Sequence, residues 1–287
     1  MKVAVAEVIS QTSFCRYTTS MLTPNKLIPV IRPMVTAFSV MWAMAVLVYI
    51  PATIPPSPSR AIAISKTFAD TAGVYLYFTL LIGPLSYLNR KNIWAAVVLK
   101  ARRTVGISVL LFALLHSLSA FFFQLGGIAG LEFLSSRYLL AMALGADALI
   151  LLLILAATSF DSVVTRMGAR MWKHLHRFVY VAALLVLAHV LLLGSRFANF
   201  HDPVVFLVFL ALSFLWMLEC NRIDAWMGRQ LPQIAQHHLG AWTGLGVVLV
   251  IAGYMFFNPH NPFSLSDHDG HYQFENRVGL DGEHGHK

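Results

Sequence analysis

The chain has 287 residues, of which 57% are hydrophobic and only 12% are Asp, Glu, Lys or Arg. Soluble domains contain about 25% charged residues, so this composition excludes an ordinary soluble protein and indicates a polytopic membrane protein. The formal net charge of +8 does not indicate nucleic-acid binding, because the basic residues follow the pattern of a membrane topology. Two cysteines, Cys15 and Cys220, are too few for a disulfide framework.

Seven apolar segments predict membrane-spanning helices, since each approaches the roughly 20 residues that a span needs. In chain order they are Val35–Ile54, Ala69–Leu88, Thr104–Leu125, Tyr138–Phe160, Phe178–Leu193, Val204–Leu218 and Leu239–Phe257. The fifth and sixth are short, and we expect Trp172–Arg177 and Glu219–Arg222 to continue them as helix. Four glycines weaken the seventh. The sequence therefore predicts an all-α membrane bundle with a six-helix core and a seventh helix.

The same pattern divides the chain into four parts. Residues 1–34 form an N-terminal arm without the apolar core of a cleavable signal peptide, so the first span should be an uncleaved anchor. Residues 35–222 form the transmembrane domain, and residues 239–257 the extra helix. Residues 258–287 form a polar tail with five histidines, for which a solvated segment is favoured over a metal-binding one.

Basic residues gather on one side of the predicted bundle if the N-terminus is cytoplasmic. That side holds 15 of the 21 Lys and Arg residues, namely Lys2, Arg16, Lys26, Arg32, Arg90, Lys91, Lys100, Arg102, Arg103, Arg166, Arg170, Lys173, Arg177, Arg222 and Arg229. Cytoplasmic segments of membrane proteins are enriched in Lys and Arg. The pattern predicts a multi-pass protein of the bacterial inner membrane with a cytoplasmic N-terminus. If the seventh segment spans, the C-terminal tail is periplasmic.

Two histidines lie at matching depth inside these apolar segments. His116 is 13 residues past Arg103, and His189 is 12 past Arg177. At 1.5 Å per residue both lie roughly 18–20 Å from the cytoplasmic surface. Ionisable side chains inside a membrane are costly and usually serve a function. Because the third and fifth helices run in the same direction, the two imidazoles could hold one haem iron between them.

A second, inner ligand is suggested by two further histidines at the start of the fifth helix. His176 precedes His189 by 13 residues, or roughly 20 Å, which suits two haem levels stacked across a membrane. On a straight helix the two rings would lie about 140° apart, whereas His174 would lie only about 60° from His189. Helix geometry alone slightly favours His174 and leaves both open.

Several motifs together resemble the ferric reductase-like transmembrane domain superfamily, and within it most closely the MsrQ haem subunits of bacterial periplasmic methionine sulfoxide reductase systems. The matching pieces are G-V-Y-L-Y-F-T-L-L-I-G-P-L at Gly73–Leu85, A-R-R-T-V-G at Ala101–Gly106, F-A-L-L-H at Phe112–His116, T-S at Thr158–Ser159, G-A-R-M-W-K-H-L-H-R-F-V-Y at Gly168–Tyr180 and L-A-H at Leu187–His189. They span somewhat under half of the chain.

The resemblance implies a six-helix bundle that binds haem b and passes electrons across the membrane. It places iron ligands at His116, His189 and His176, and so selects His176 over His174. Many relatives carry a second histidine on the third helix, where this chain has Arg103. One haem between His116 and His189 is therefore expected, and a second at His176 would need a different axial partner or none. Arg103 is either an orientation signal or a partner of haem propionates.

The resemblance also implies an oxidoreductase subunit that depends on other components. A separate flavin reductase or quinol is the expected electron donor, with FMN or a quinone as a further candidate cofactor. The expected acceptor is a periplasmic molybdenum-containing methionine sulfoxide reductase or Fe(III). The alternative from another class is a haem-free metal-ion or proton transporter that uses His116, His189 and Asp147 as a relay. For Asp147, proton handling and a hydrogen bond to a hydroxyl group are equally expected.

Overall fold

The computed structural model describes residues 24–88, 93–193, 203–230, 242, 244–246 and 249. The elements of this part are all helical, which confirms the predicted all-α class. The chain divides into two compact units, Met1–Leu193 and Gly194–Lys287. The histidines that the sequence singled out as ligands all belong to the first unit.

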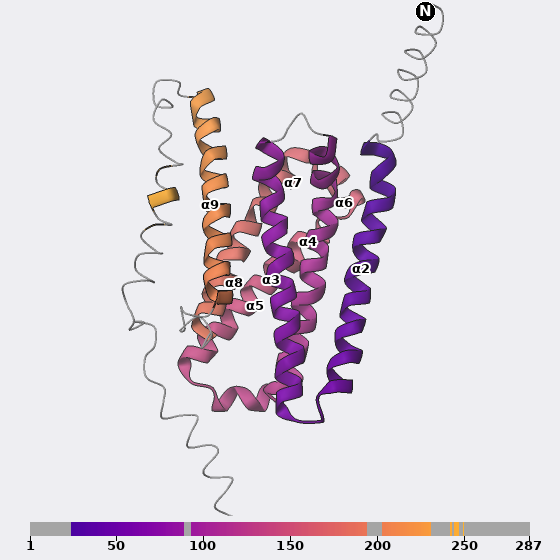
Figure 1. The fold of residues 1–287 in the computed structure, drawn as a ribbon, viewed down its shortest axis with the longest axis vertical. Helices are drawn as coiled ribbons and strands as arrows, with labels where there is room; N and C mark the ends of the chain where they lie inside the picture. The colour runs from indigo at the N-terminus through magenta and orange to yellow at the C-terminus, as the bar shows by residue number, and fades with distance from the viewer. Residues whose placement is uncertain are drawn as a thin grey trace, which may run out of the picture. The chain divides into compact units, whose positions relative to one another are not determined.

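Within its described residues, the first unit contains seven α-helices and three short helical turns of other types (Figure 1). The α-helices are α2 (Pro24–Thr53), α3 (Pro58–Leu88), α4 (Ile93–Ser119), α5 (Ser136–Ala157), α6 (Asp161–Met167), α7 (Ala169–Leu175) and α8 (Val179–Leu193). The π-helix η1 (Ala120–Gln124) extends α4, and the 3₁₀ turns are η2 (Ile128–Phe133) and η3 (His176–Phe178). The second unit contributes α9 (Pro203–Gln230).

Six segments of the described residues are long and apolar enough to cross a membrane, in agreement with the predicted six-helix core. The fifth span, Ala169–Leu193, joins α7, η3 and α8. The sixth continues through Glu219–Arg222, as expected. α2 and α3 begin well before their apolar segments, because hydropathy marks the part inside the membrane and not the end of the helix. The predicted seventh segment, Leu239–Phe257, lies mostly outside the described residues, and the tail after it lies entirely outside.

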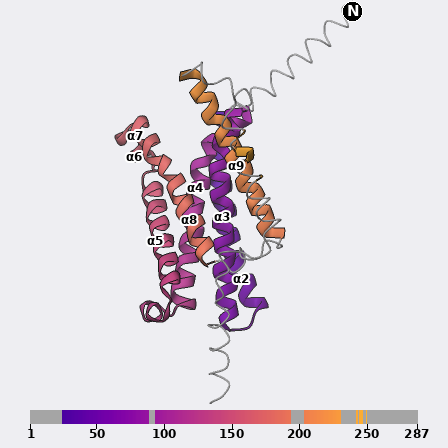
Figure 2. The ribbon, with the colours of Figure 1, turned by 90° about the vertical axis from the view of Figure 1, so that its left-hand side faces the viewer.

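Two antiparallel helix pairs position the site, α3 with α4 and α5 with α8 (Figure 2). Along the first pair, Arg102 Nε donates to the carbonyl of Thr79 at 2.7 Å. Along the second, Arg137 Nε donates to the carbonyl of Leu192 at 3.0 Å, which satisfies a carbonyl at the C-terminal end of α8. These bonds fix which residues of the paired helices face each other.

A buried cluster joins α2, α3 and α4 on the cytoplasmic side of His116 in the predicted topology. Phe112 is fully buried and contacts the rings of Phe68 and Tyr75 at centroid distances of 6.4 and 5.2 Å. Ser39 donates to the hydroxyl group of Ser108 at 2.9 Å. Phe112 lies one helical turn before His116, so this cluster holds the turn of α4 that carries the histidine.

Candidate functional site: a facing pair of histidines

The structure brings His116 of α4 and His189 of α8 together, as the matching depths predict. The centroids of their rings are 6.4 Å apart, and the ring planes are inclined at 76°. Both side chains are partly buried. Two segments 73 positions apart in the sequence thus present imidazoles to one another inside the bundle.

The Nδ1 atom of His116 is held by Ser65 of α3. It lies 3.0 Å from the carbonyl oxygen of Ser65 and 3.0 Å from its hydroxyl oxygen. Ser65 is buried, with 2% of its surface exposed. A carbonyl oxygen can only accept a hydrogen bond, so Nδ1 of His116 carries the proton.

The Nδ1 atom of His189 is held in the same way by α5. It lies 2.6 Å from the carbonyl oxygen of Ala141. The same argument places the proton of His189 on Nδ1. Both rings therefore have the tautomer that leaves the Nε2 lone pair available to a metal ion.

The geometry of the pair fits an iron atom held from both sides. A metal–imidazole bond is about 2 Å and the bonding nitrogen lies about 1 Å from the ring centre, so two axial imidazoles have centroids roughly 6 Å apart. The observed 6.4 Å agrees with this distance. Histidine ligands also usually donate their other ring N–H to a carboxylate or a backbone carbonyl, as both do here.

The inner histidine His176 lies in the 3₁₀ turn η3, and this turn changes the angular argument made from the sequence. Each step of a 3₁₀ helix turns the chain by about 120°, against about 100° in an α-helix. With three such steps, the angle around the helix axis between His176 and His189 becomes roughly 80°, and the angle between His174 and His189 becomes roughly 120°. The straight-helix estimate that favoured His174 does not apply to this span, because the span is not a continuous α-helix.

His176 belongs to a cluster of polar and aromatic side chains at the end of α5. Its Nε2 lies 3.3 Å from the hydroxyl oxygen of Thr158, and its ring stacks on Trp172 with centroids 4.2 Å apart. Trp172 Nε1 donates to the carbonyl of Thr158 at 3.1 Å. The guanidinium carbon of Arg103 lies over the ring of Trp172, 5.4 Å from its centroid. Arg103 also forms an ion pair with Asp161.

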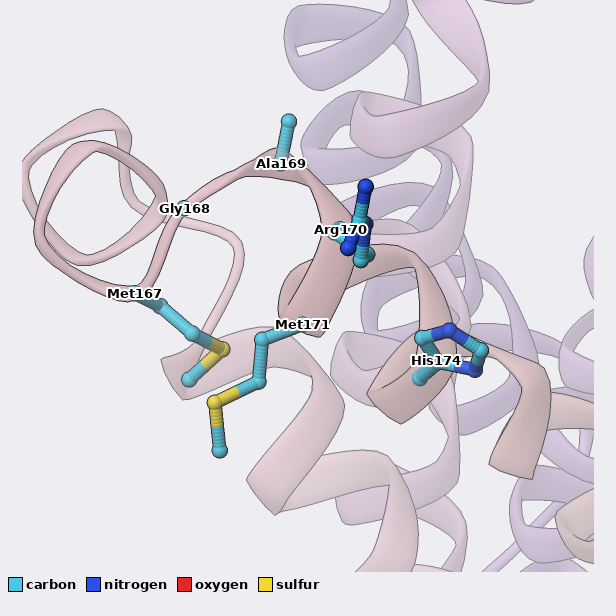
Figure 3. Close-up of a pocket in the computed structure, with 6 residues that line it drawn as sticks. All are labelled: Met167, Gly168, Ala169, Arg170, Met171 and His174. Atoms are coloured by element: carbon cyan, nitrogen blue, oxygen red, sulfur yellow. The ribbon is translucent and has the colours of Figure 1, made fainter.

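His174 has a different environment. It is exposed and borders an open surface depression at the bend between α6 and α7 (Figure 3). Gly168 forms this bend with a φ of +82°, in the left-handed region that glycine adopts readily. His174 therefore faces the surface of the first unit, whereas His176 is half-buried against Trp172 and Thr158.

Asp147 does not join the histidine pair. It lies on an exposed face of α5, and no hydrogen bond or ion pair connects it to His116 or His189 in the described part of the chain. Within the described residues no group of three or more His, Cys, Asp and Glu side chains is placed to hold a metal ion. Neither proposed role of Asp147, proton handling or a bond to a hydroxyl group, gains support from this position.

Three residues that hold the pair were not found from the sequence: Ser65, Ala141 and Gly145. The first two act through backbone carbonyls, which leave no signature in a sequence. Gly145 is the only glycine of α5. A glycine inside an otherwise apolar helix lowers helix propensity, and this is a signal that the backbone is approached closely there.

The chain is similar to known membrane proteins over about half of its length. Residues 69–187 match a family described as the ferric reductase like transmembrane component. The chain is 31% identical over 168 residues to the protein-methionine-sulfoxide reductase heme-binding subunit MsrQ of Azospira oryzae, covering 56% of this chain and 68% of that protein. It is 33% identical over 144 residues to MsrQ of Yersinia pseudotuberculosis, covering 49% of this chain and 66% of that protein. No solved structure matches significantly.

The six apolar spans and the match over residues 69–187 are those of a membrane protein of the ferric reductase-like class. Within that class, the chain belongs to the MsrQ family. The class match covers residues 69–187, so it contains His116 of α4 and ends two residues before His189 of α8.

Proposed function

We propose that this protein is a haem-binding electron-transfer subunit of the inner membrane, with one haem b held between Nε2 of His116 and Nε2 of His189. The observation that carries the proposal is the pair itself, with both Nδ1 protons directed to backbone carbonyls and centroids 6.4 Å apart. The relatives named above are called heme-binding subunits. Bound haem would supply one-electron redox chemistry, and the chain would supply ligands and an apolar surrounding that set its potential.

The cluster at the end of α5 supports an inner entry point for electrons. His176 is the candidate ligand of a second haem, and Arg103 is the candidate donor to an anionic group of that cofactor or of bound FMN. One nitrogen of Arg103, Nη1, is already paired with Asp161, so an anionic group would share the guanidinium with this partner or replace it. A flavin reductase or quinol would deliver electrons on the cytoplasmic side.

Electrons would leave at the outer haem to a periplasmic acceptor. The names of the relatives favour a methionine sulfoxide reductase partner, and Fe(III) is the second candidate. The N-terminus would be cytoplasmic, as the distribution of basic residues predicts. A metal-ion or proton relay is disfavoured, because Asp147 lies away from the histidine pair.

The test is the absorption spectrum of the full chain purified in detergent, with a haem count per chain. The wild-type protein should show a Soret band that shifts on reduction with dithionite. His116→Ala and His189→Ala should each remove the outer haem, whereas His174→Ala, at an exposed position, should not. A folded but colourless wild-type protein would refute the proposal. Reduction by NADH with a flavin reductase, compared with reduction by quinol, then identifies the donor.

A further inference from the structure

The close approach between α5 and the ring of His189 occurs at Gly145. A methyl group at this position would lie 2.7 Å from Nδ1, 2.9 Å from Cε1 and 3.4 Å from Cγ of His189. Real side chains do not pack at the first two distances, so any residue other than glycine would displace the imidazole. The ring passes over a gap in the surface of α5 that only glycine leaves open.

This gap gives His189 access to its hydrogen-bond acceptor. Ala141 lies one helical turn before Gly145, and in an α-helix its carbonyl also accepts the N–H of Gly145. The ring must therefore reach that carbonyl alongside Gly145, where it makes its 2.6 Å contact. A Cβ atom at position 145 would block this approach from the side.

The sequence of α5 supports a specific need for glycine at this one position. Other small positions of the helix are alanines, including Ala143, Ala146 and Ala148. Alanine has a higher helix propensity than glycine. Helix stability would be better served by alanine and therefore does not explain the glycine.

Resting on the proposed haem site, we propose that Gly145 is a positioning residue for the axial ligand His189. Its missing side chain lets Nδ1–H of His189 donate to the carbonyl of Ala141, which keeps the Nε2 lone pair directed at the iron. A hydrogen bond of this kind makes the imidazole a stronger donor and stabilises ferric over ferrous haem. Gly145 therefore influences both haem retention and the midpoint potential of the outer haem.

The experiment compares Gly145→Ala with two matched substitutions in the same unit. Among the described residues, a methyl group at Gly73 would meet nothing within 4 Å, and one at Gly106 would meet only Thr79 Cγ2 at 3.7 Å. Gly145→Ala should lose at least half of its outer haem, and the haem that remains should have a higher midpoint potential. A tenfold loss of preference for the ferric state corresponds to about 59 mV for one electron. Gly73→Ala and Gly106→Ala should match the wild type.

A second variant separates displacement of the ring from misfolding. In a His189→Gly background, free imidazole is expected to restore the outer haem, because it is not tethered to α8 and can shift within the site. Adding Gly145→Ala should then have little further effect. Failure of imidazole to restore haem only when Gly145→Ala is present would overturn the proposal, since it would point to damaged helix packing. A single Gly145→Ala variant with the wild-type haem content and potential would also overturn it, while leaving the haem site itself intact.

Discussion

Ser65→Ala tests how His116 is held, because Ser65 contacts the ring through two different oxygens. The substitution removes the hydroxyl oxygen, 3.0 Å from Nδ1, and retains the carbonyl oxygen at the same distance. If the carbonyl accepts the Nδ1 proton, the hydroxyl contributes only a secondary bond. A neutral hydrogen bond contributes about 1 kcal/mol, so haem affinity should fall about fivefold.

The measurement is a titration of haem into the purified apoprotein, followed at the Soret band. Ser119→Ala is the matched control, because Ser119 is a buried serine of the same helix whose hydroxyl donates to the backbone carbonyl of His116 and not to the ring. The control should bind haem as the wild type does, and His116→Ala should not form the outer site.

Complete loss of the outer haem in Ser65→Ala would refute the reasoning. It would mean that the hydroxyl oxygen of Ser65, and not its carbonyl oxygen, is the acceptor that holds the Nδ1 proton of His116.

Two further outcomes follow from the geometry of the bundle. If a second haem is bound, His176→Ala should lower the haem count by one per chain, and His174→Ala should leave the count unchanged. The reverse result would show that the 3₁₀ turn does not determine the inner ligand. Phe112→Ala should lower the stability of the folded protein by about 3 kcal/mol, because its fully buried ring packs between aromatic side chains of α3. Phe123→Ala, at a position 74% exposed, should change stability by less than about 0.5 kcal/mol. Thermal unfolding in detergent measures both, and equal losses of stability would contradict the assignment of Phe112 to the core.

Much of the architecture follows from properties that are local in the sequence. Hydropathy depends on consecutive residues, so it predicted the six spans, and the spacing of His116 and His189 from basic residues predicted their common depth. The ends of α2 and α3 were not predicted, because helices extend beyond the apolar segment that the membrane requires. The straight-helix estimate failed at His176, because one 3₁₀ turn rotates all side chains that precede it relative to all side chains that follow it.

The sequence by itself determined the class of protein, the number of core spans and the two facing histidines. Only the tertiary structure decided which atoms hold those histidines, because Ser65 and Ala141 act through backbone carbonyls that any residue would provide. It also decided that the lack of a side chain at Gly145 is important, since a missing side chain matters only where another helix approaches. The exposed position of Asp147 and the pairing of Arg103 with Asp161 were likewise decided by helix packing, which brings together residues that are distant in the chain.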